Sequence, residues 1–120
     1  MDAETLWPRY AIIWSSEPTL RERELKACLA DDATYCDPNG ALEGRAALSG
    51  YMGGFQQSVP GGRFEIIQVT AHNGRSLARW ALLDADGAVR QFGASFATHD
   101  GLGRLKDISG FFPLTAPEIS

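Results

Sequence analysis

The chain has 120 residues, of which 44% are hydrophobic and 22% are charged. This length matches one average domain, and this balance is typical of a globular protein with a packed core, so disorder, a fibrous repeat and a two-domain chain are excluded. Eleven basic and fifteen acidic residues give a net charge of -4, and the Lys and Arg residues are scattered along the sequence. We therefore expect one domain over 1–120 that does not bind nucleic acid.

Neither a membrane segment nor a disulfide framework is predicted. The apolar runs are far shorter than the ~20 residues that span a bilayer. The first four residues carry two acidic side chains, Asp2 and Glu4, where a signal peptide is basic. The two cysteines, Cys28 and Cys36, form no CxxC pair. We expect a cytoplasmic protein with reduced thiols and no membrane contact.

Two amphipathic helices are expected at the start of the chain. Apolar side chains spaced by three and four residues line one face between residues 3 and 14. Thr19 and Glu22 have the spacing of a capping box and follow Pro18. A second helix therefore begins there, and the Asp31-Asp32 pair ends it.

A short hairpin and a third helix are expected next. Residues 33–37 are rich in β-forming side chains, and 41–43 can pair with them across the turn Pro38-Asn39-Gly40. A helical face then extends from Arg45 to about Val59, although three glycines weaken it by about 1 kcal/mol each relative to alanine. So many glycines in one helix indicate that another backbone packs close to it.

Strand patterns replace helical ones after residue 62. Four strands are predicted over 63–71, 76–83, 89–98 and 104–112, separated by short turn clusters. Short turns join antiparallel neighbours, and helices followed by strands indicate the α+β class. We expect one antiparallel sheet with the helices over its inner face, and a frayed tail over 113–120.

Asp37 stands at the end of the first short strand, directly before Pro38. Two roles are open to its carboxylate. It can accept the backbone N–H groups of the following turn, as Asp commonly does before such a sequence. It can also act as a base if it faces a cavity.

The segment that contains Asp37 resembles a known family. LADDATYCDPNG, residues 29–40, is similar to the run FADDATVEDPVG of ketosteroid isomerases and, more broadly, to the SnoaL-like branch of the nuclear transport factor 2-like superfamily. The resemblance also covers 42–48, the turn DGLGRL and the sequence GFF, so it spans nearly the whole chain. It implies a cone: a curved antiparallel sheet wrapped around three helices, with an apolar pocket in the concave face and a homodimer formed through the sheet.

The resemblance also implies roles for particular residues. Asp37 matches the general base of the isomerases. Tyr10, which follows Arg9 as in the RY pair of the family, resembles the tyrosine that donates to the developing oxyanion. Ser95 stands where the isomerases carry a protonated Asp, so this chain has a shorter donor at that position.

Alternation along the strands assigns the cavity walls. If Trp80 points inward, Arg79 faces out, and a shift of one residue would exchange them. Phe55, Trp80 and Phe112 are then the expected walls of the substrate site. The two histidines lie at strand ends without a third ligand at metal spacing, so we expect neither a metal nor a cofactor.

Two functions fit these patterns. The first is a small cofactor-free enzyme of isomerase, cyclase or dehydratase type that acts on an apolar carbonyl compound, with Asp37 as base and with Tyr10 and Ser95 as hydrogen-bond donors. The alternative is a non-catalytic module that binds a hydrophobic ligand or serves dimerisation. Tyr10, on the apolar face of its helix, is either a donor in the pocket or a side chain of the core. The orientation of Asp37, into the cavity or onto its own turn, distinguishes the two.

Overall fold

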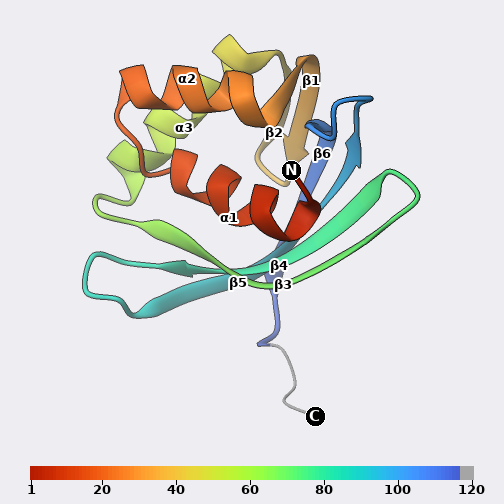
Figure 1. The fold of residues 1–120 in the computed structure, drawn as a ribbon. Helices are drawn as coiled ribbons and strands as arrows, with labels where there is room; N and C mark the ends of the chain where they lie inside the picture. Colours follow the sequence, from red (N-terminus) through yellow and green to blue (C-terminus); the bar gives the residue numbers. More distant parts are fainter. Residues whose placement is uncertain (117–120) are drawn as a thin grey trace.

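The computed structural model describes residues 1–116 and contains three helices and six strands. The helices are α1 (Ala3–Ile13), α2 (Pro18–Cys28) and α3 (Arg45–Ser58). The strands are β1 (Leu29–Asp37), β2 (Gly40–Glu43), β3 (Arg63–His72), β4 (Arg75–Leu83), β5 (Val89–His99) and β6 (Leu105–Leu114). The helices lie together on one side of the sheet (Figure 1). Within this part of the chain, no helix is both long and apolar enough to cross a bilayer.

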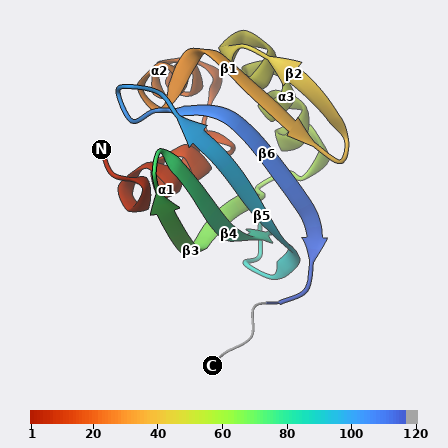
Figure 2. The ribbon, with the colours of Figure 1, turned by 90° about the vertical axis from the view of Figure 1, so that its right-hand side faces the viewer.

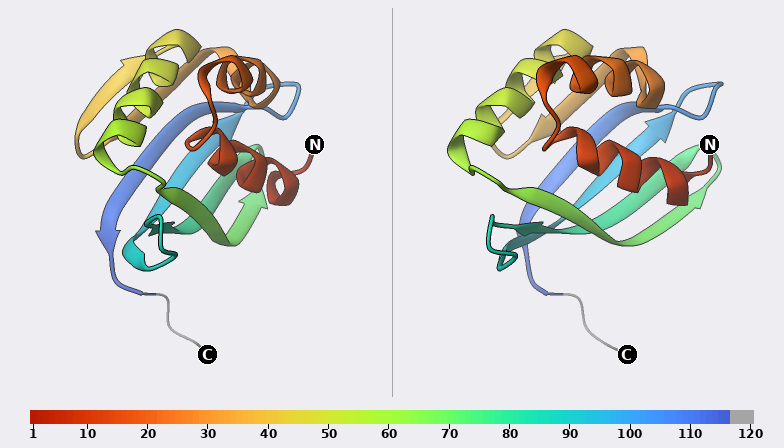
Figure 3. Two further views of the ribbon diagram at one scale, coloured as in Figure 1. Left: turned by 90° about the vertical axis from the view of Figure 1, so that its left-hand side faces the viewer. Right: turned by 60° about the vertical axis from the view of Figure 1, so that its left-hand side comes forward.

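The six strands form one curved sheet in the order β2-β1-β6-β5-β4-β3. The α+β class and the helix-covered sheet are confirmed, but the pair β1–β6 is parallel, so the sheet is mixed rather than purely antiparallel (Figure 2). A long stretch of chain separates these two strands, and therefore no tight turn forces them to run in opposite directions. A register shift between Ile66 and Gln68 interrupts the pairing of β3 with β4. Such bulges bend strands, and the sheet curves around the helices (Figure 3).

The boundaries of α2 differ from those predicted. The residue that caps its start is Glu17, whose carboxylate accepts the backbone N–H groups of Thr19 at 3.0 Å and Leu20 at 2.7 Å. Pro18 then occupies the first helical position, where no backbone N–H is needed. The predicted capping box at Thr19 and Glu22 is therefore wrong, because the proline at the first helical position moves the N-cap two residues earlier, from Thr19 to Glu17.

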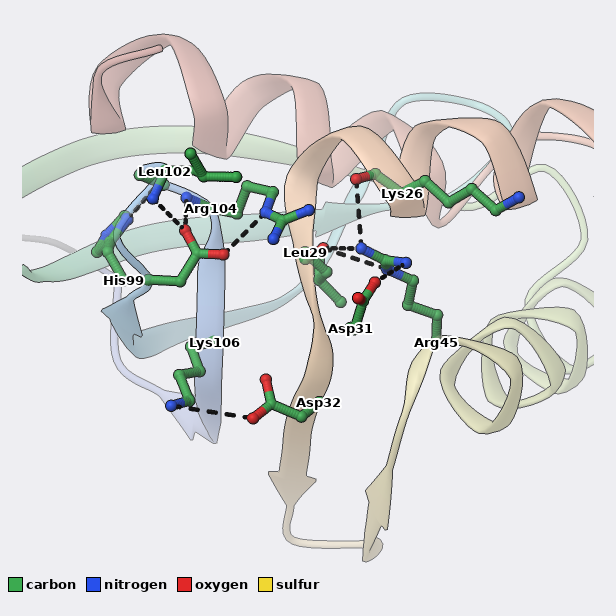
Figure 4. Close-up of polar contacts among 11 residues, drawn as sticks. Lys26, Leu29, Asp31, Asp32, Arg45, His99, Leu102, Arg104 and Lys106 are labelled. Atoms are coloured by element: carbon green, nitrogen blue, oxygen red, sulfur yellow. Dashed lines mark hydrogen bonds and ion pairs between the residues drawn. The ribbon is translucent and has the colours of Figure 1, made fainter.

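At its other end, α2 stops at Cys28, and the Asp31-Asp32 pair belongs to β1. Arg45 of α3 explains this early end, because its guanidinium donates to the carbonyl oxygen of Leu29 at 2.7 Å (Figure 4). The same guanidinium forms an ion pair with Asp31. A cation at the carboxyl end of a helix satisfies free carbonyl groups and allows the chain to leave the helix as a strand.

The end of the chain also differs from the prediction. Pro113 and Leu114, expected in a frayed tail, are the last residues of β6. The rest of the predicted tail from 117 to 120 lies outside the described residues.

A partly buried chain of hydrogen bonds holds α1 against the sheet. Nε1 of Trp7 donates to Oγ of Ser76 at 2.8 Å, and this oxygen lies 2.7 Å from Nε2 of His99. Nδ1 of His99 lies 2.9 Å from the carbonyl oxygen of Gly103. Because a carbonyl can only accept, His99 carries its hydrogen on Nδ1, and the Ser76 hydroxyl donates to Nε2.

We predict that Ser76→Ala lowers the free energy of unfolding by about 1–3 kcal/mol, because the buried indole N–H of Trp7 loses its acceptor. Urea denaturation followed by circular dichroism measures the change. Ser15→Ala removes an exposed serine hydroxyl and is the matched control, expected within about 0.5 kcal/mol of the wild type. Equal effects of the two substitutions would contradict the anchoring role of Ser76.

Candidate active site

A cavity of about 770 Å³ lies between the helices and the concave face of the sheet. Aromatic side chains dominate its lining: Trp7, Tyr10, Trp14, Tyr35, Tyr51, Phe55, Phe64, Trp80 and Phe112. The polar side chains in the lining are Asp37, Asn39, Ser58, Gln91 and Ser95. An apolar cavity with a few polar groups is the usual form of a small-molecule site. Among residues 1–116, no group of three His, Cys, Asp or Glu side chains is arranged to hold a metal ion.

The side chains singled out from the sequence all border this cavity: Tyr10, Asp37, Phe55, Trp80, Ser95 and Phe112. The strand register is the one in which Trp80 points inward. Arg79, its neighbour on β4, is on the opposite face. Of the two registers left open by the sequence, the structure has the one that puts Trp80 in the cavity lining.

Asp37, the last residue of β1, both caps its own turn and borders the cavity, two orientations that are alternatives when judged from the sequence. Its Oδ1 atom accepts the backbone N–H of Asn39 at 2.8 Å, so the carboxylate does cap its own turn. Its Oδ2 atom accepts the hydroxyl groups of Tyr35 and Tyr51, each at 2.7 Å, and the side chain borders the cavity. The turn contact therefore fixes the carboxylate without turning it away from the cavity.

Neither Tyr35 nor Tyr51 is among the site residues predicted from the sequence. Tyr35 precedes Asp37 by two residues on one strand, so alternation puts both on the same face, and this signal was available. Tyr51 comes from α3, and only the tertiary structure brings it to Asp37. Burial, together with the hydrogen bond to the Asp37 carboxylate, raises the pKa of Tyr51 to about 12, and burial raises the pKa of Tyr35 as well. Both tyrosines are therefore neutral donors near pH 7.

Tyr10 lies on the buried face of α1, with its ring edge-on to Trp7 and Trp14. Its hydroxyl has no hydrogen-bond partner within residues 1–116, and burial raises the pKa of Tyr10. A buried hydroxyl without a partner is rare in proteins. Tyr10 thus belongs to the core and also borders the cavity, so the two roles considered for it do not exclude each other.

Ser95 and Asp37 flank Gly110 of β6. A methyl carbon added to Gly110 would lie 3.5 Å from Cβ of Asp37 and 3.6 Å from Oγ of Ser95. Asp37 and Ser95 therefore lie to either side of a glycine, with no side chain of β6 between them.

The glycines of α3 have a role that differs from the one predicted. A methyl carbon added to Gly50 or Gly54 would meet nothing within 4 Å, and both residues border the cavity. At Gly53, the nearest atom is Nη2 of Arg21 at 3.5 Å. The expectation that another backbone packs closely against α3 is wrong, because two of these glycines face the cavity instead.

The family model described as SnoaL-like domain matches residues 20–107 of the chain. No protein of curated function matches the sequence. Among solved structures, a candidate isomerase of the SnoaL-like family from Agrobacterium tumefaciens superposes with a TM-score of 0.84. The match covers 89% of this chain and 93% of that chain, with 23% sequence identity.

Two further solved structures share the fold. A candidate ketosteroid isomerase from Kribbella flavida has a TM-score of 0.69 and 20% identity, over 97% of this chain and 81% of that chain. A candidate polyketide cyclase from Xanthomonas campestris has a TM-score of 0.65 and 20% identity, over 92% and 89%. Likeness at these identities establishes the fold and leaves the activity open. The family model, however, covers most of the sequence that builds this curved sheet and confirms the resemblance, so the chain belongs to the SnoaL-like domain family.

Proposed function

We propose that this protein is a small enzyme that removes a proton from the carbon next to the carbonyl group of an apolar small molecule, without a cofactor. The observation that carries the proposal is the position of Asp37, a carboxylate held at the border of an aromatic cavity. Solved structures of the same fold bear the names isomerase and polyketide cyclase, and both kinds of reaction are compatible with such a first step.

In the proposed step, Asp37 takes the proton, the electron pair of the C–H bond forms the C=C bond of an enolate, and the carbonyl electrons move to the oxygen. A carboxylate has about four acceptor positions, and the three donors of Asp37 leave about one of them for this proton. Tyr10 and Ser95 are the proposed donors to the enolate oxygen, because negative charge that develops in an apolar cavity needs hydrogen bonds.

Three outcomes are possible for the enolate. Asp37 can return the proton to another carbon, which is isomerisation. The enolate carbon can instead attack a second carbonyl of the same molecule, and the resulting alkoxide then takes the proton, which is cyclisation. If the substrate carries a hydroxyl group on the carbon next to the deprotonated carbon, that group leaves with the proton as water, which is dehydration.

The proposed walls of the substrate site are Phe55, Trp80 and Phe112. The Trp80 and Phe112 rings lie 5.8 Å apart, and Phe55 stacks on Phe64 at 5.0 Å, so the walls support one another. An apolar ligand would gain affinity mainly by covering these rings.

The same hydrogen bonds favour a second candidate function. A carboxylate that caps a turn and accepts two tyrosine hydroxyls is also what a purely structural Asp requires. In that case the chain is a module that holds a hydrophobic ligand in the cavity and performs no chemistry.

Paired substitutions separate the enzyme from the binder. With a substrate found among enolisable ketones and polyketide-like compounds, we predict that Asp37→Asn lowers the turnover rate about 10²-fold or more, because general-base contributions have this size. Tyr10→Phe lowers the rate by up to about 10²-fold, since one donor to the oxyanion is lost. Ligand affinity changes little in either variant, because binding comes from the walls.

Asp32→Asn is the matched control, because Asp32 lies on the same strand with its side chain 74% exposed. A substrate whose turnover is indifferent to Asp37→Asn would refute the mechanism. If no compound is turned over, but Trp80→Ala or Phe112→Ala weakens ligand binding, the binding module is the correct function.

A titration tests the contact between Asp37 and Tyr51 directly. Burial raises the pKa of Tyr51, and the Asp37 carboxylate, which accepts the Tyr51 hydroxyl and repels a phenolate, raises it further. We predict that Asp37→Asn lowers this pKa from about 12 toward the ~10 of a free tyrosine. NMR titration of labelled tyrosine measures it, with Asp32→Asn again as control. An unchanged pKa of Tyr51 in Asp37→Asn would show that the carboxylate is not its partner.

We also propose that the protein is a homodimer formed through the convex face of the sheet. On this face Leu77, Phe96 and Phe111 are 43%, 37% and 57% exposed. Arg79 and Asp107 lie on the same face, carry opposite charges and form no ion pair within residues 1–116. A two-fold axis turns one patch onto itself, so it can bring Arg79 to the partner subunit's Asp107 as the apolar residues meet.

Sedimentation equilibrium at micromolar concentration tests the dimer. The expected mass is twice the 13.0 kDa of the chain, and Phe96→Glu or Phe111→Glu reduces it to that of one chain, because a buried unpaired charge opposes association. Leu102→Glu, in the exposed turn between β5 and β6, is the control that leaves the mass unchanged. A wild-type mass near 13.0 kDa would exclude the dimer.

A further inference from the structure

Trp80 of β4 and Ser95 of the neighbouring strand β5 share a hydrogen bond at the cavity wall. Nε1 of Trp80 lies 3.1 Å from Oγ of Ser95. An indole nitrogen can only donate, so Ser95 accepts, and one lone pair of its oxygen is occupied. Within residues 1–116, the hydroxyl hydrogen of Ser95 has no acceptor of its own. Ser95 is therefore a donor whose oxygen is already oriented by the protein.

Gly93 holds the indole in this orientation. It is the direct partner of Trp80 in the register of β4 and β5, and it lies two residues before Ser95 on the same face. A methyl carbon on Gly93 would lie 2.2 Å from Cζ2 of Trp80, which is closer than real contacts allow. The indole ring thus lies directly on the backbone of β5, a position that only glycine permits.

Aromatic neighbours close the remaining sides of the indole. Phe64 meets it edge-on at 5.0 Å between ring centroids, and Phe112 meets it at 5.8 Å. The ring has the strand backbone beneath it and other rings beside it, so it has little freedom to rotate. Its N–H group consequently points to Ser95 whether or not a ligand is present.

We infer that Trp80 and Gly93 are positioning residues for Ser95, which donates its hydrogen to an acceptor oxygen of the bound ligand. The inference rests on the proposed function for the role of that oxygen, which is the carbonyl oxygen that becomes the enolate oxygen. Ser95 lies beside Gly110 opposite Asp37, so a ligand that bridges this gap has its oxygen at Ser95 and the adjacent carbon at Asp37. The ligand class that fits is a ring compound with a carbonyl or anionic oxygen at one end.

The hydrogen bond is tested by NMR of the labelled indole groups. The signal of Trp80 is the one that disappears in Trp80→Phe. We expect Ser95→Ala to shift this signal, with the signals of Trp7 and Trp14 unmoved. Gly93→Ala also shifts the Trp80 signal, because the added methyl displaces the ring, whereas Gly101→Ala adds a methyl where nothing lies within 4 Å and leaves it in place. A Trp80 signal that is indifferent to Ser95→Ala overturns the inference.

The positioning role is tested with 4-nitrophenolate, an aromatic ring that carries one anionic oxygen. We expect Ser95→Ala to weaken its binding about tenfold or more, since a hydrogen bond to a charged oxygen is lost. Trp80→Phe weakens binding in the wild-type background but adds little in the Ser95→Ala background, because Trp80 acts through Ser95. Nitrobenzene, which lacks the anionic oxygen, binds equally well to the wild type and to Ser95→Ala.

Two results would overturn the positioning role. If the effects of Trp80→Phe and Ser95→Ala on the binding of 4-nitrophenolate were fully additive, Trp80 would only line the cavity and would not position Ser95. Equal binding of 4-nitrophenolate to the wild type and to Ser95→Ala would remove Ser95 as a donor to the ligand. Neither measurement requires turnover, so they decide the role of Trp80 independently of the kinetic test of Asp37.

Discussion

Trp14 packs its indole against rings from both layers of the molecule. Centroid separations of 5.6 to 6.5 Å join it to Tyr10, Tyr35, Tyr51, Phe55 and Phe64. These partners come from α1, β1, α3 and β3, so one side chain ties the helices to the sheet. Most of the contacts are edge-on, and each contributes about 0.5–1.5 kcal/mol beyond burial of its area. Bulky rings that meet at their edges do not fill the space inside the curved sheet, and the cavity is what remains.

The electrostatic character of this cavity follows from a single carboxylate. Asp37 is the only charged side chain in the lining formed by residues 1–116. A carboxylate among aromatic rings is costly unless it is hydrogen-bonded, and Tyr35, Tyr51 and the backbone of Asn39 supply the donors. The contacts that make the charge tolerable also hold it in place. Stability and the proposed catalytic role therefore depend on the same hydrogen bonds.

Glycines serve this cavity in opposite ways. Any side chain at position 93 would clash with the indole of Trp80, which lies on the backbone of Gly93. Gly50 and Gly54 have open space where a side chain would stand, and they leave that space to the cavity. Gly93 in β5 allows the large side chain of Trp80 to approach the strand. Gly50 and Gly54 leave the cavity open, although they weaken α3 itself.

Local patterns in the sequence determined the order of helices and strands, the α+β class and which residues of a strand share a face, while the tertiary structure decided which face points inward. Trp80 points inward and Arg79 outward because alternation is a property of any extended chain with one covered face. The turn contact of Asp37 also followed from its place directly before Pro38 at the end of a strand. Such features depend on neighbours a few residues apart, and periodicity expresses them directly.

Tertiary structure alone decided the contacts between distant segments. Tyr51 reaches Asp37 only because α3 lies across the concave face of the sheet. The spacing of the two residues along the chain does not indicate that their side chains meet. The parallel pairing of β1 with β6 likewise depends on how the whole sheet curves around the helices. The surroundings of the α3 glycines depend on the tertiary structure for the same reason. A sequence shows that a side chain is missing, but what occupies the space beside it depends on how the helix packs against the rest of the chain.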